Sequence, residues 1–430
     1  MTGARRHPRA LMLLANPFLP DPRVLKEARS LLRHGYEITV LAWDREERFP
    51  PAEDHQGIRI ERIRVRSRYD RKLSQLPRIL LLWYRMILLG RRKDIDIIHC
   101  HDLDTLFPGI VLKLLLKKPL CYDAHENYAL VKSVSLPIFF VKMLRLAEKL
   151  LLNKADAIFT ASTFVGDEFR AVTRRPVITI GNYWPLDVSA HISPDEVAGE
   201  RDRLGIPPGH LTIVYIGGLK RTRKIAPLLE VVQDGMGVHL VICGAGEQQD
   251  AVEQEARRKR CVTYLDWVPL ERVPLYSRLS DVVYYGLEKY PGALYNSPNA
   301  LFLALATGRA MLATDIGDLG EIVRRERCGI VMRRCDREEV LSALARLKNR
   351  TFLRSLQDNA LCAARERYNW DHAERMLLRT YRRLLQPERA GVMAMEAAGA
   401  LGSAGDMELA GATEAAGRVE TTGGIQLDGG

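Results

Sequence analysis

The sequence has few cysteines and no long apolar run. These two features argue against a disulfide-bonded secreted protein and against a membrane-spanning protein. Its seven cysteines are scattered along 430 residues, and none forms a Cys-x-x-Cys pair. This spacing indicates reduced thiols in a cytosolic protein rather than a disulfide framework. No run of about 18 apolar residues is present, so a membrane-spanning helix is not expected. The basic residues 1–9 precede an apolar run of only five residues, which does not fit a secretory signal. We therefore expect a cytoplasmic protein, soluble or peripheral on the inner face of the plasma membrane.

The charge of the chain is unevenly distributed. The formal net charge is +11, yet residues 59–93 hold twelve Arg and Lys against two acids, and residues 387–430 hold seven acids against two arginines. A helix expected over residues 74–89 mixes these arginines with Trp83 and Tyr84. Such a mixture suits an interfacial helix on anionic lipid, although a solvated helix packed by one apolar face would look similar. No nucleic-acid motif accompanies the charge, so nucleic acid is not an expected partner.

Strand-like and helix-like segments alternate along the chain, which is typical of parallel α/β sheets. With 47% apolar residues, a chain of this length can bury two cores. Strands are expected at 10–16, 37–42, 57–65, 96–100, 119–122, 157–161 and 177–180, and again at 212–216, 239–243, 262–265, 281–285, 310–314 and 330–332. Helices are expected at 23–34, 105–116, 136–153, 225–233, 298–307, 337–348 and 370–385. Gly35 follows the first helix as a left-handed C-terminal cap.

This pattern predicts two doubly wound, Rossmann-like domains that face one another across a cleft. The expected boundaries are 8–181 for the first domain and 182–367 for the second, with a hinge at 181–185. A helix at 368–386 follows, and the composition of 387–430 predicts a disordered tail.

Ligands of open α/β sheets bind at the carboxyl ends of the strands, so the residues there are candidate ligands. In the second half the first such end carries Gly217 and Gly218, followed by four cations, among them Arg221, Arg223 and Lys224. A diphosphate requires close approach to backbone, a helix N-terminus and cationic side chains. The pattern alone is weak, because turn glycines followed by surface lysines are common.

The order of the later segments makes the pattern more specific. The glycine turn is followed by Gly244-Ala-Gly, by Leu265-Asp-Trp-Val-Pro and by the run YNSPNALFLALATGRAMLATDIGDLGEIV from Tyr295 to Val323. This order resembles the donor half of the family 4, GT-B-fold retaining glycosyltransferases, over residues 10–385. The resemblance implies a UDP- or GDP-sugar donor used as a substrate, with no cofactor. The donor-binding residues that it implies are Gly217, Gly218, Arg221, Arg223, Lys224, Gly244, Trp267, Val268, Asn299 and Leu303.

One expected ligand of that family is missing. The family carries a glutamate at the position of Leu303, where it binds the ribose hydroxyls, and many members carry another eight residues earlier, at the position of Tyr295. A hydrogen bond to a charged group is worth about 1.5–3 kcal/mol, so the loss weakens a donor site without necessarily abolishing it. Asn299, Tyr295 and Glu321 are candidates to replace it.

The first half carries candidate acceptor and catalytic residues. Segments Asn16–Glu27, His99–Asp102 and Tyr122–Glu126 each end a strand, and they resemble the acceptor-side segments of a subgroup of the family. This resemblance implies acceptor-binding roles for Asn16, Asp21, Arg23 and Asp102, and catalytic roles for His101, His125 and Glu126. A buried histidine is often only structural, which is our preferred interpretation for His99.

No metal is expected. Asp94-Ile-Asp96 and Asp102-Leu-Asp104 match Asp-x-Asp, but two such matches in a chain of this length are common, and the first precedes its strand. The GT-B family usually neutralises its leaving group with cations and helix dipoles instead.

The sequence therefore predicts transfer of a sugar to a glycan or lipid-linked acceptor, with cell-envelope polysaccharide as the expected product. Two alternatives remain open. One is a catalytically impaired GT-B protein that acts as a scaffold or partner of another glycosyltransferase, and the other is a sugar-nucleotide epimerase on the same fold.

Overall fold

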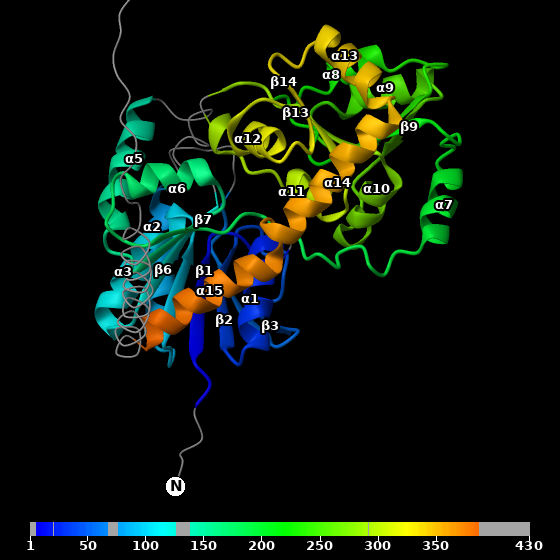
Figure 1. Cartoon of the computed structure of the whole chain (residues 1–430). Helices are drawn as coiled ribbons and strands as arrows, with labels where there is room; N and C mark the ends of the chain where they lie inside the picture. The colour runs from blue at the N-terminus through cyan, green and yellow to red at the C-terminus, as the bar shows by residue number, and fades with distance from the viewer. Residues whose placement is uncertain (1–5, 20, 68–75, 126–137, 291, 387–430) are drawn as a thin grey trace, which may run out of the picture. The chain divides into compact units, whose positions relative to one another are not determined.

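The computed structural model describes residues 6–19, 21–67, 76–125, 138–290 and 292–386 of the chain. Two largely parallel β-sheets occupy successive halves of the sequence (Figure 1). The described residues as far as Leu378 form one compact unit that contains both sheets. Segment 387–430, for which the sequence predicts disorder, lies outside the described residues. Within the described residues, no helix combines the length and the apolar character needed to cross a membrane.

In the described part of the chain, the first sheet has eight strands in the order β3-β4-β2-β1-β5-β6-β7-β8. These are β1 (Arg9–Leu14), β2 (Glu37–Asp44), β3 (Ala52–His55), β4 (Ile58–Arg64), β5 (Ile97–His101), β6 (Leu120–Ala124), β7 (Ala157–Thr160) and β8 (Val177–Thr179). All are parallel to their neighbours except β3, which pairs antiparallel with β4. The sequence does not predict β3, because its residues Ala-Glu-Asp-His lack an apolar run and pairing with β4 alone makes them a strand.

The second sheet has six described strands, all parallel, in the order β11-β10-β9-β12-β13-β14. They are β9 (Leu211–Ile216), β10 (Val238–Cys243), β11 (Val262–Leu265), β12 (Val282–Tyr285), β13 (Ala310–Thr314) and β14 (Gly329–Met332). The sequence predicts all six to within one residue. Central strands in such sheets are buried on both faces, so their continuous apolar runs are strong signals.

Helices of the first half are α1 (Pro22–Arg33), α2 (Leu76–Gly90), α3 (Leu103–Leu116), α5 (Ile138–Leu152) and α6 (Thr163–Arg170). Asp21 begins α1, because its Oδ1 accepts from the Val24 N–H at 3.2 Å. Gly35 just past the helix has φ 81°, which confirms the predicted left-handed cap. Helices α3, α5 and α6 cover one face of the first sheet with a shared buried core.

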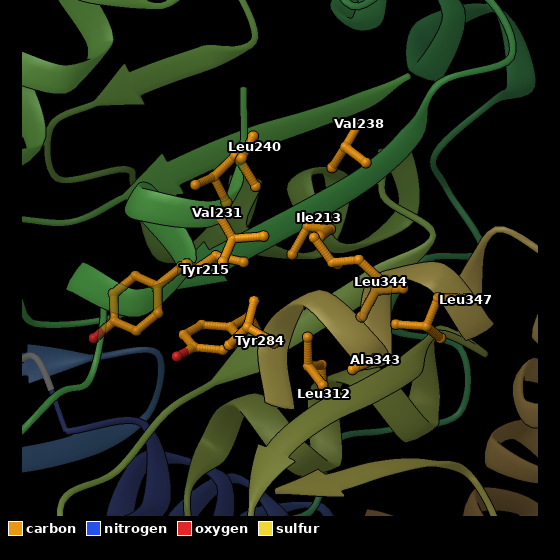
Figure 2. Close-up of a cluster of buried hydrophobic side chains, with 14 of the residues drawn as sticks. Ile213, Tyr215, Val231, Val238, Leu240, Tyr284, Leu312, Ala343, Leu344 and Leu347 are labelled. Carbon is orange, nitrogen blue, oxygen red and sulfur yellow. The ribbon is translucent and has the colours of Figure 1, made fainter. Parts of the chain in front are cut away.

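Helices of the second half are α7 (Pro194–Arg203), α8 (Ala226–Val231), α9 (Gln249–Arg258), α10 (Val273–Leu279), α11 (Asn299–Ala306), α12 (Gly317–Arg325), α13 (Arg337–Leu347), α14 (Arg350–Glu366) and α15 (Trp370–Leu385). Figure 2 shows the core between the second sheet and its helices, in which Tyr215 of β9, Tyr284 of β12 and Leu344 of α13 belong to one buried cluster. At the start of α15, Trp370 Nε1 donates to Ser30 Oγ at 2.9 Å. Glu374 forms an ion pair with Arg33 at 2.8 Å, so this helix begins against α1.

The loops that follow β9 and β10 lie in direct backbone contact. Gly217 N–H donates to Cys243 O at 3.0 Å, and Leu219 N–H donates to Ala245 O at 2.9 Å. Gly244 has φ 143°, and a Cβ atom on it would lie 2.0 Å from the Gly217 carbonyl oxygen. Only glycine can occupy this position, for reasons of both backbone conformation and space.

We expect Gly244→Ala to lower the free energy of unfolding by at least about 2 kcal/mol, because the clash is with backbone that cannot rotate away. Gly199→Ala is the matched control, because Gly199 lies in helix α7 and a Cβ atom added to it would have no other atom within 4 Å. It should raise stability by about 0.5–1 kcal/mol. Urea unfolding of both variants checks this, and equal effects would contradict the close approach.

Candidate active site

A buried ion pair lies at the carboxyl end of the first sheet. Arg23, at the start of α1, donates from Nε to Asp123 Oδ2 at 2.8 Å and from Nη2 to Asp123 Oδ1 at 2.7 Å. Both side chains are buried. Arg23 Nη1 also donates to Ile180 O at 2.6 Å. Burial alone would raise the pKa of Asp123, but Arg23 and His125 hold it well below its ordinary value.

Two histidines join this pair. His101 ends β5 and His125 follows β6, and the distance from His101 Nδ1 to His125 Nε2 is 3.1 Å. His125 Nε2 lies 3.2 Å from Asp123 Oδ2, while its Nδ1 lies 3.6 Å from Asp102 Oδ2. Asp102 Oδ1 also accepts from the His125 backbone N–H at 3.1 Å. The structure therefore brings together Arg23, Asp102, His101 and His125, all of which the sequence singled out.

The two histidines differ in charge. Burial would lower the pKa of His125, but the carboxylates of Asp102 and Asp123 raise it to about 10. The pKa of His101 is lowered, first by burial and despite Asp123. At neutral pH, His125 is therefore an imidazolium that donates hydrogen bonds, and His101 is a neutral ring. His125 in this state can hold an anion or a hydroxyl oxygen, but it cannot accept a proton as a general base.

The sequence-based site omits two charged residues of α1 that belong to this cluster. Glu27 is buried, and its Oε1 lies 3.4 Å from Arg23 Nε. Burial, followed by the charge of Asp123, raises the pKa of Glu27 to about 8. Lys26 donates to the Tyr183 carbonyl, and its Nζ lies 4.8 Å from the Trp370 ring centroid. Burial and Arg23 lower its pKa to about 7. The spacing of Arg23 and Glu27, one helical turn apart, was the only available signal.

Four side chains of this cluster have the chemistry of metal ligands. Potential ligand atoms of Glu27, His99, His101 and Asp123 all lie within 4.8 Å of one another. The two carboxylates of this group already face a cation, however, because the Arg23 guanidinium binds both oxygens of Asp123 and lies 3.4 Å from Glu27 Oε1. Arg23 thus balances the charge of these carboxylates, and the expectation that no metal is used stays a prediction. His99 is buried and stacks on His101, with ring centroids 4.4 Å apart.

The remaining acceptor-side candidates have local roles in the loop after β1. Asn16 Nδ2 donates to Asp21 Oδ2 at 2.8 Å, and Asn16 Oδ1 accepts from the Phe18 N–H at 2.7 Å. Asp21 also caps α1. These bonds fix the loop that presents Arg23. Glu126, predicted to be catalytic, lies outside the described residues.

On the donor side, the three predicted cations separate from one another. Arg221 is 87% exposed, with its Nε 3.9 Å from Glu247. Lys224 Nζ donates to the Arg334 carbonyl at 2.7 Å. Arg223 is half-buried, and its guanidinium lies 4.6 Å from the ring centroid of Tyr285, the last residue of β12. The three cations therefore do not form one cluster: Arg223 lies over Tyr285 at the end of β12, whereas Lys224 reaches the carbonyl of Arg334 just past β14.

The other donor-side candidates also occupy different environments. Gly217 and Gly218 are partly exposed after β9, while Trp267 after β11 is 69% exposed and Val268 is half-buried. Asn299 is exposed at the first position of α11. Leu303, one turn later, is buried in the core. Whether each binds a donor stays a prediction.

A pocket of about 580 Å³ lies at the carboxyl ends of β12 and β13, and the sequence-based site covers little of it. It is lined by Phe164, Lys289, Tyr290, Leu294, Asp315, Ile316, Gly317, Glu321 and Arg324. Arg324 pairs with Asp315 at 2.5 Å. Among these residues the sequence proposed Glu321 as a substitute for the glutamate expected at Leu303, and Asp315, Ile316 and Gly317 also lie in the run from Tyr295 to Val323. The Lys-Tyr pair after β12 offered no motif that could have identified it.

The group formed by Arg23, His101, Asp102, Asp123 and His125 is called the histidine cluster. Hydrogen bonds connect this cluster to the loop before α11. Asn182 Oδ1 lies 3.5 Å from Arg23 Nη1, and Asn182 Nδ2 donates to Ser297 O at 3.0 Å. A second link joins α6 to α12, where the Thr163 N–H donates to Asp318 Oδ2 at 2.9 Å. Polar contacts therefore run between segments that belong to the two sheets.

We expect Arg23→Met to lower the free energy of unfolding by about 3–5 kcal/mol, because it leaves the Asp123 carboxylate buried without its partner. Arg29→Met on the exposed side of α1 is the control and should change stability by less than about 1 kcal/mol. Urea unfolding measures both. A small effect at Arg23 would show that Asp123 does not depend on it.

The charge of His125 gives a second expectation. Because its folded pKa of about 10 lies above the ordinary 6.5, the stabilisation is complete below about pH 6.5 and is lost as pH rises through about 10. In ¹⁵N-histidine NMR spectra, His125 should remain protonated at pH 8 while His101 is neutral. A His125 midpoint at or below pH 6.5 would contradict the proposed charge arrangement.

Comparisons with known proteins agree with this architecture. A family model described as a glycosyl transferase 4-like domain matches residues 20–182, and a model of glycosyl transferases group 1 matches residues 210–350. The chain is 23% identical over 368 residues to an uncharacterized glycosyltransferase of Methanocaldococcus jannaschii, covering 83% of this chain and 92% of that protein. It is also 23% identical over 405 residues to a D-inositol 3-phosphate glycosyltransferase of Nocardia farcinica, covering 86% of each.

Solved structures show the same fold. A sucrose-phosphate synthase of Thermosynechococcus elongatus superposes with a TM-score of 0.71 at 16% identity, covering 88% of this chain and all of that one. Anabaena HepE in complex with UDP-glucose superposes with a TM-score of 0.66 at 17% identity, covering 87% and 99% of the two chains. These likenesses establish the GT-B fold that the sequence predicts. The two family models together match more than half of the chain, which therefore belongs to the glycosyltransferases as a family 4-like protein.

Proposed function

We propose that this glycosyltransferase moves a sugar from a UDP- or GDP-sugar to a glycan or lipid-linked acceptor, in the synthesis of cell-envelope polysaccharide. The observation that carries the proposal is the 580 Å³ pocket at the carboxyl ends of β12 and β13, lined by both cations and carboxylates. Such a pocket is of the size that holds a small ligand. Solved structures of the same fold include Anabaena HepE with UDP and with UDP-glucose, which supports the donor class.

On the donor side, Arg223 is the candidate cation for the diphosphate, because its guanidinium lies over Tyr285 at the end of β12, whereas Arg221 is 87% exposed and Lys224 Nζ already donates to the Arg334 carbonyl. The loop that carries it is firmly held: Lys224 N–H donates to Gly286 O at 3.1 Å, and Leu287 N–H donates to Thr314 Oγ1 at 2.9 Å. A fixed guanidinium can neutralise the charge that develops on the departing diphosphate without reorganising.

Sugar hydroxyls need acceptors as well as donors, and the pocket supplies both. Glu321 and Asp315 line it with Lys289 and Arg324. Because Leu303 is buried in the core, we assign to Glu321 the hydroxyl-binding role that a glutamate at 303 would have. Binding through Glu321 would change which sugar or nucleotide is preferred, since the carboxylate comes from α12 rather than α11.

On the acceptor side, the His125 imidazolium is the candidate donor of a hydrogen bond to an acceptor oxygen through Nδ1, whose distance of 3.6 Å from Asp102 Oδ2 is too long for a hydrogen bond, while Nε2 faces Asp123. Asp102 and Asp123 hold its ring, and Arg23 holds Asp123. The proton of the acceptor hydroxyl must pass to another base, because His125 is already protonated. Retention of configuration follows from the family resemblance, and the product anomer tests it.

A scaffold without catalysis is the second candidate. The observations that favour it are the burial of Leu303 and the separation of Arg221 and Lys224, which engage Glu247 and Arg334 instead. Such a protein would bind a partner glycosyltransferase and no nucleotide-sugar.

The deciding experiment combines donor binding with product analysis. The purified chain is titrated with UDP, GDP and their glucose and mannose derivatives by calorimetry, then incubated with donor and lipid-linked acceptors before mass spectrometry. Binding with a new glycosidic product supports the proposal. Absence of nucleotide binding favours the scaffold, and conversion of the donor without acceptor indicates an epimerase.

We expect Arg223→Ala to weaken binding of UDP or GDP, whichever the chain prefers, by about 10- to 100-fold, since a hydrogen bond to a charged group is worth about 1.5–3 kcal/mol. Arg257→Ala is the control, because that side chain is 80% exposed on α9 and pairs only with Glu253 in the described structure. Calorimetry measures both affinities. An unchanged affinity in Arg223→Ala would remove this residue from the diphosphate site.

A further inference from the structure

Helix α5 carries a row of large apolar side chains that no described element covers. Phe139, Met143, Leu146 and Leu150 follow one another at three- and four-residue spacing, so they share one side of the helix. All four are exposed, Phe139 to 68% and Leu150 to 65%. The opposite side carries Val141 and Leu152, which are buried. A helix that is apolar on its outer side as well as its inner side usually contacts something else.

The exposed apolar surface extends over two neighbouring helices. Leu80, Leu81 and Tyr84 are exposed on α2, and Phe107, Leu114 and Leu115 are exposed on α3. Helix α2 packs against α3, with the Trp83 and Phe107 rings 4.8 Å apart, and α3 packs against α5. The outward apolar residues of α2, α3 and α5 are called the apolar face below.

Positive charge accompanies the apolar face. Residues 76–93, 103–118 and 138–154, which contain the three helices and the residues after them, hold twelve Arg and Lys but only two acids, Asp104 and Glu148. Glu148 is buried and accepts from Tyr122 Oη at 2.7 Å, so it does not offset the surface charge. Lys117, Lys142 and Lys149 form no ion pair with any residue in the described ranges, whereas Lys113 pairs with Asp156 and Arg145 with Glu168.

The basic block of residues 59–93 contributes less than its sequence indicates. Arg62 is buried against Glu53, while Arg59 and Lys93 both pair with Glu61. These arginines lie on β4 in the sheet, not on α2. The positive charge that could face a membrane therefore comes mainly from the helices of the apolar face. Residues 68–75 of the basic block lie outside the described residues.

We propose that the apolar face docks on an anionic lipid bilayer, with its aromatic and aliphatic side chains at the acyl boundary and its lysines at the headgroups. Exposed apolar side chains together with lysines that form no ion pair among the described residues favour an anionic bilayer over an apolar protein partner. A purely apolar protein surface would not require the positive charge of these lysines. A second copy of the chain would bring the same positive charges together, which disfavours self-association through this face.

The position of the apolar face also indicates a lipid-linked sugar acceptor, an inference that rests on the proposed glycosyltransferase function. His101 and Asp102 immediately precede α3, and Phe107 lies on the first turns of that helix. Phe139 and Phe140 lie on the first turn of α5. The exposed rings therefore lie toward the helix ends nearest the histidine cluster. A bilayer bound there would hold a lipid-linked acceptor with its polar head at this end of the sheet.

The experiment is cosedimentation of the purified full chain with vesicles, in the absence of any sugar donor. Phosphatidylcholine vesicles with phosphatidylglycerol should bind the chain, those without it should bind at least about tenfold more weakly, and added salt should reduce binding. Phe139→Ser, Met143→Ser and Leu146→Ser together should lower binding at least about tenfold. Leu270→Ser with Leu341→Ser, exposed leucines of the second half, should leave it unchanged.

Charge reversal tests the second component. Lys142→Glu with Lys149→Glu should lower binding to anionic vesicles by more than about tenfold, while Lys348→Glu, just after α13, should have little effect. Circular dichroism verifies that each variant is folded. Absence of vesicle binding, equal binding to neutral vesicles, or a soluble oligomer that the serine variants disperse would each overturn the proposal.

These outcomes are separable from the proposed function. Vesicle binding without sugar transfer leaves the docking face intact and removes the enzyme assignment. Transfer to a water-soluble acceptor without vesicle binding removes the docking face and leaves the glycosyltransferase.

Discussion

The buried pair of Arg23 and Asp123 is the interaction on which the rest of the first half depends. A carboxylate without solvent contact is costly, and two parallel hydrogen bonds from one guanidinium are among the few arrangements that offset this cost. The same guanidinium reaches the Ile180 carbonyl and lies near Asn182. One side chain thereby joins α1, the end of β6 and the connection toward the second sheet. The carboxylate of Asp123 that it binds acts together with Asp102 to keep His125 charged.

The donor side is organised by backbone rather than by charge. The turns after β9 and β10 touch through glycine, and the loop of Arg223 is bonded to the turn after β12. The backbone of these turns sets the direction of each side chain. Arg221 and Lys224, although close in sequence, therefore contact different partners, Glu247 and the Arg334 carbonyl. Leu303 of α11 is buried in the core, and the acidic side chains that line the pocket are Asp315, just after β13, and Glu321 of α12.

Helices of the first sheet connect the histidine cluster with the apolar face. Helix α3 begins directly after the residues that form the histidine cluster, and its outer side belongs to the apolar face. In a parallel sheet, the helix that follows each strand starts at the edge where ligands bind, so a ligand that approaches along that side meets both. The enzyme class is thus compatible with a substrate that remains in a lipid layer while its head group is modified.

The sequence by itself determined the parallel α/β order, all but one of the described strands, the glycine turns and the histidines at strand ends, because apolar runs and turn residues act locally. It could not determine β3, whose four residues become a strand only by pairing with β4. Tertiary structure alone decided that Glu27 and Lys26 join the site, that Arg221 and Lys224 turn to other partners, and that Lys289 and Arg324 line a pocket. Those outcomes depend on which side chains from distant segments contact one another and on how deeply they are buried. The local sequence pattern predicts neither the long-range contacts nor the burial.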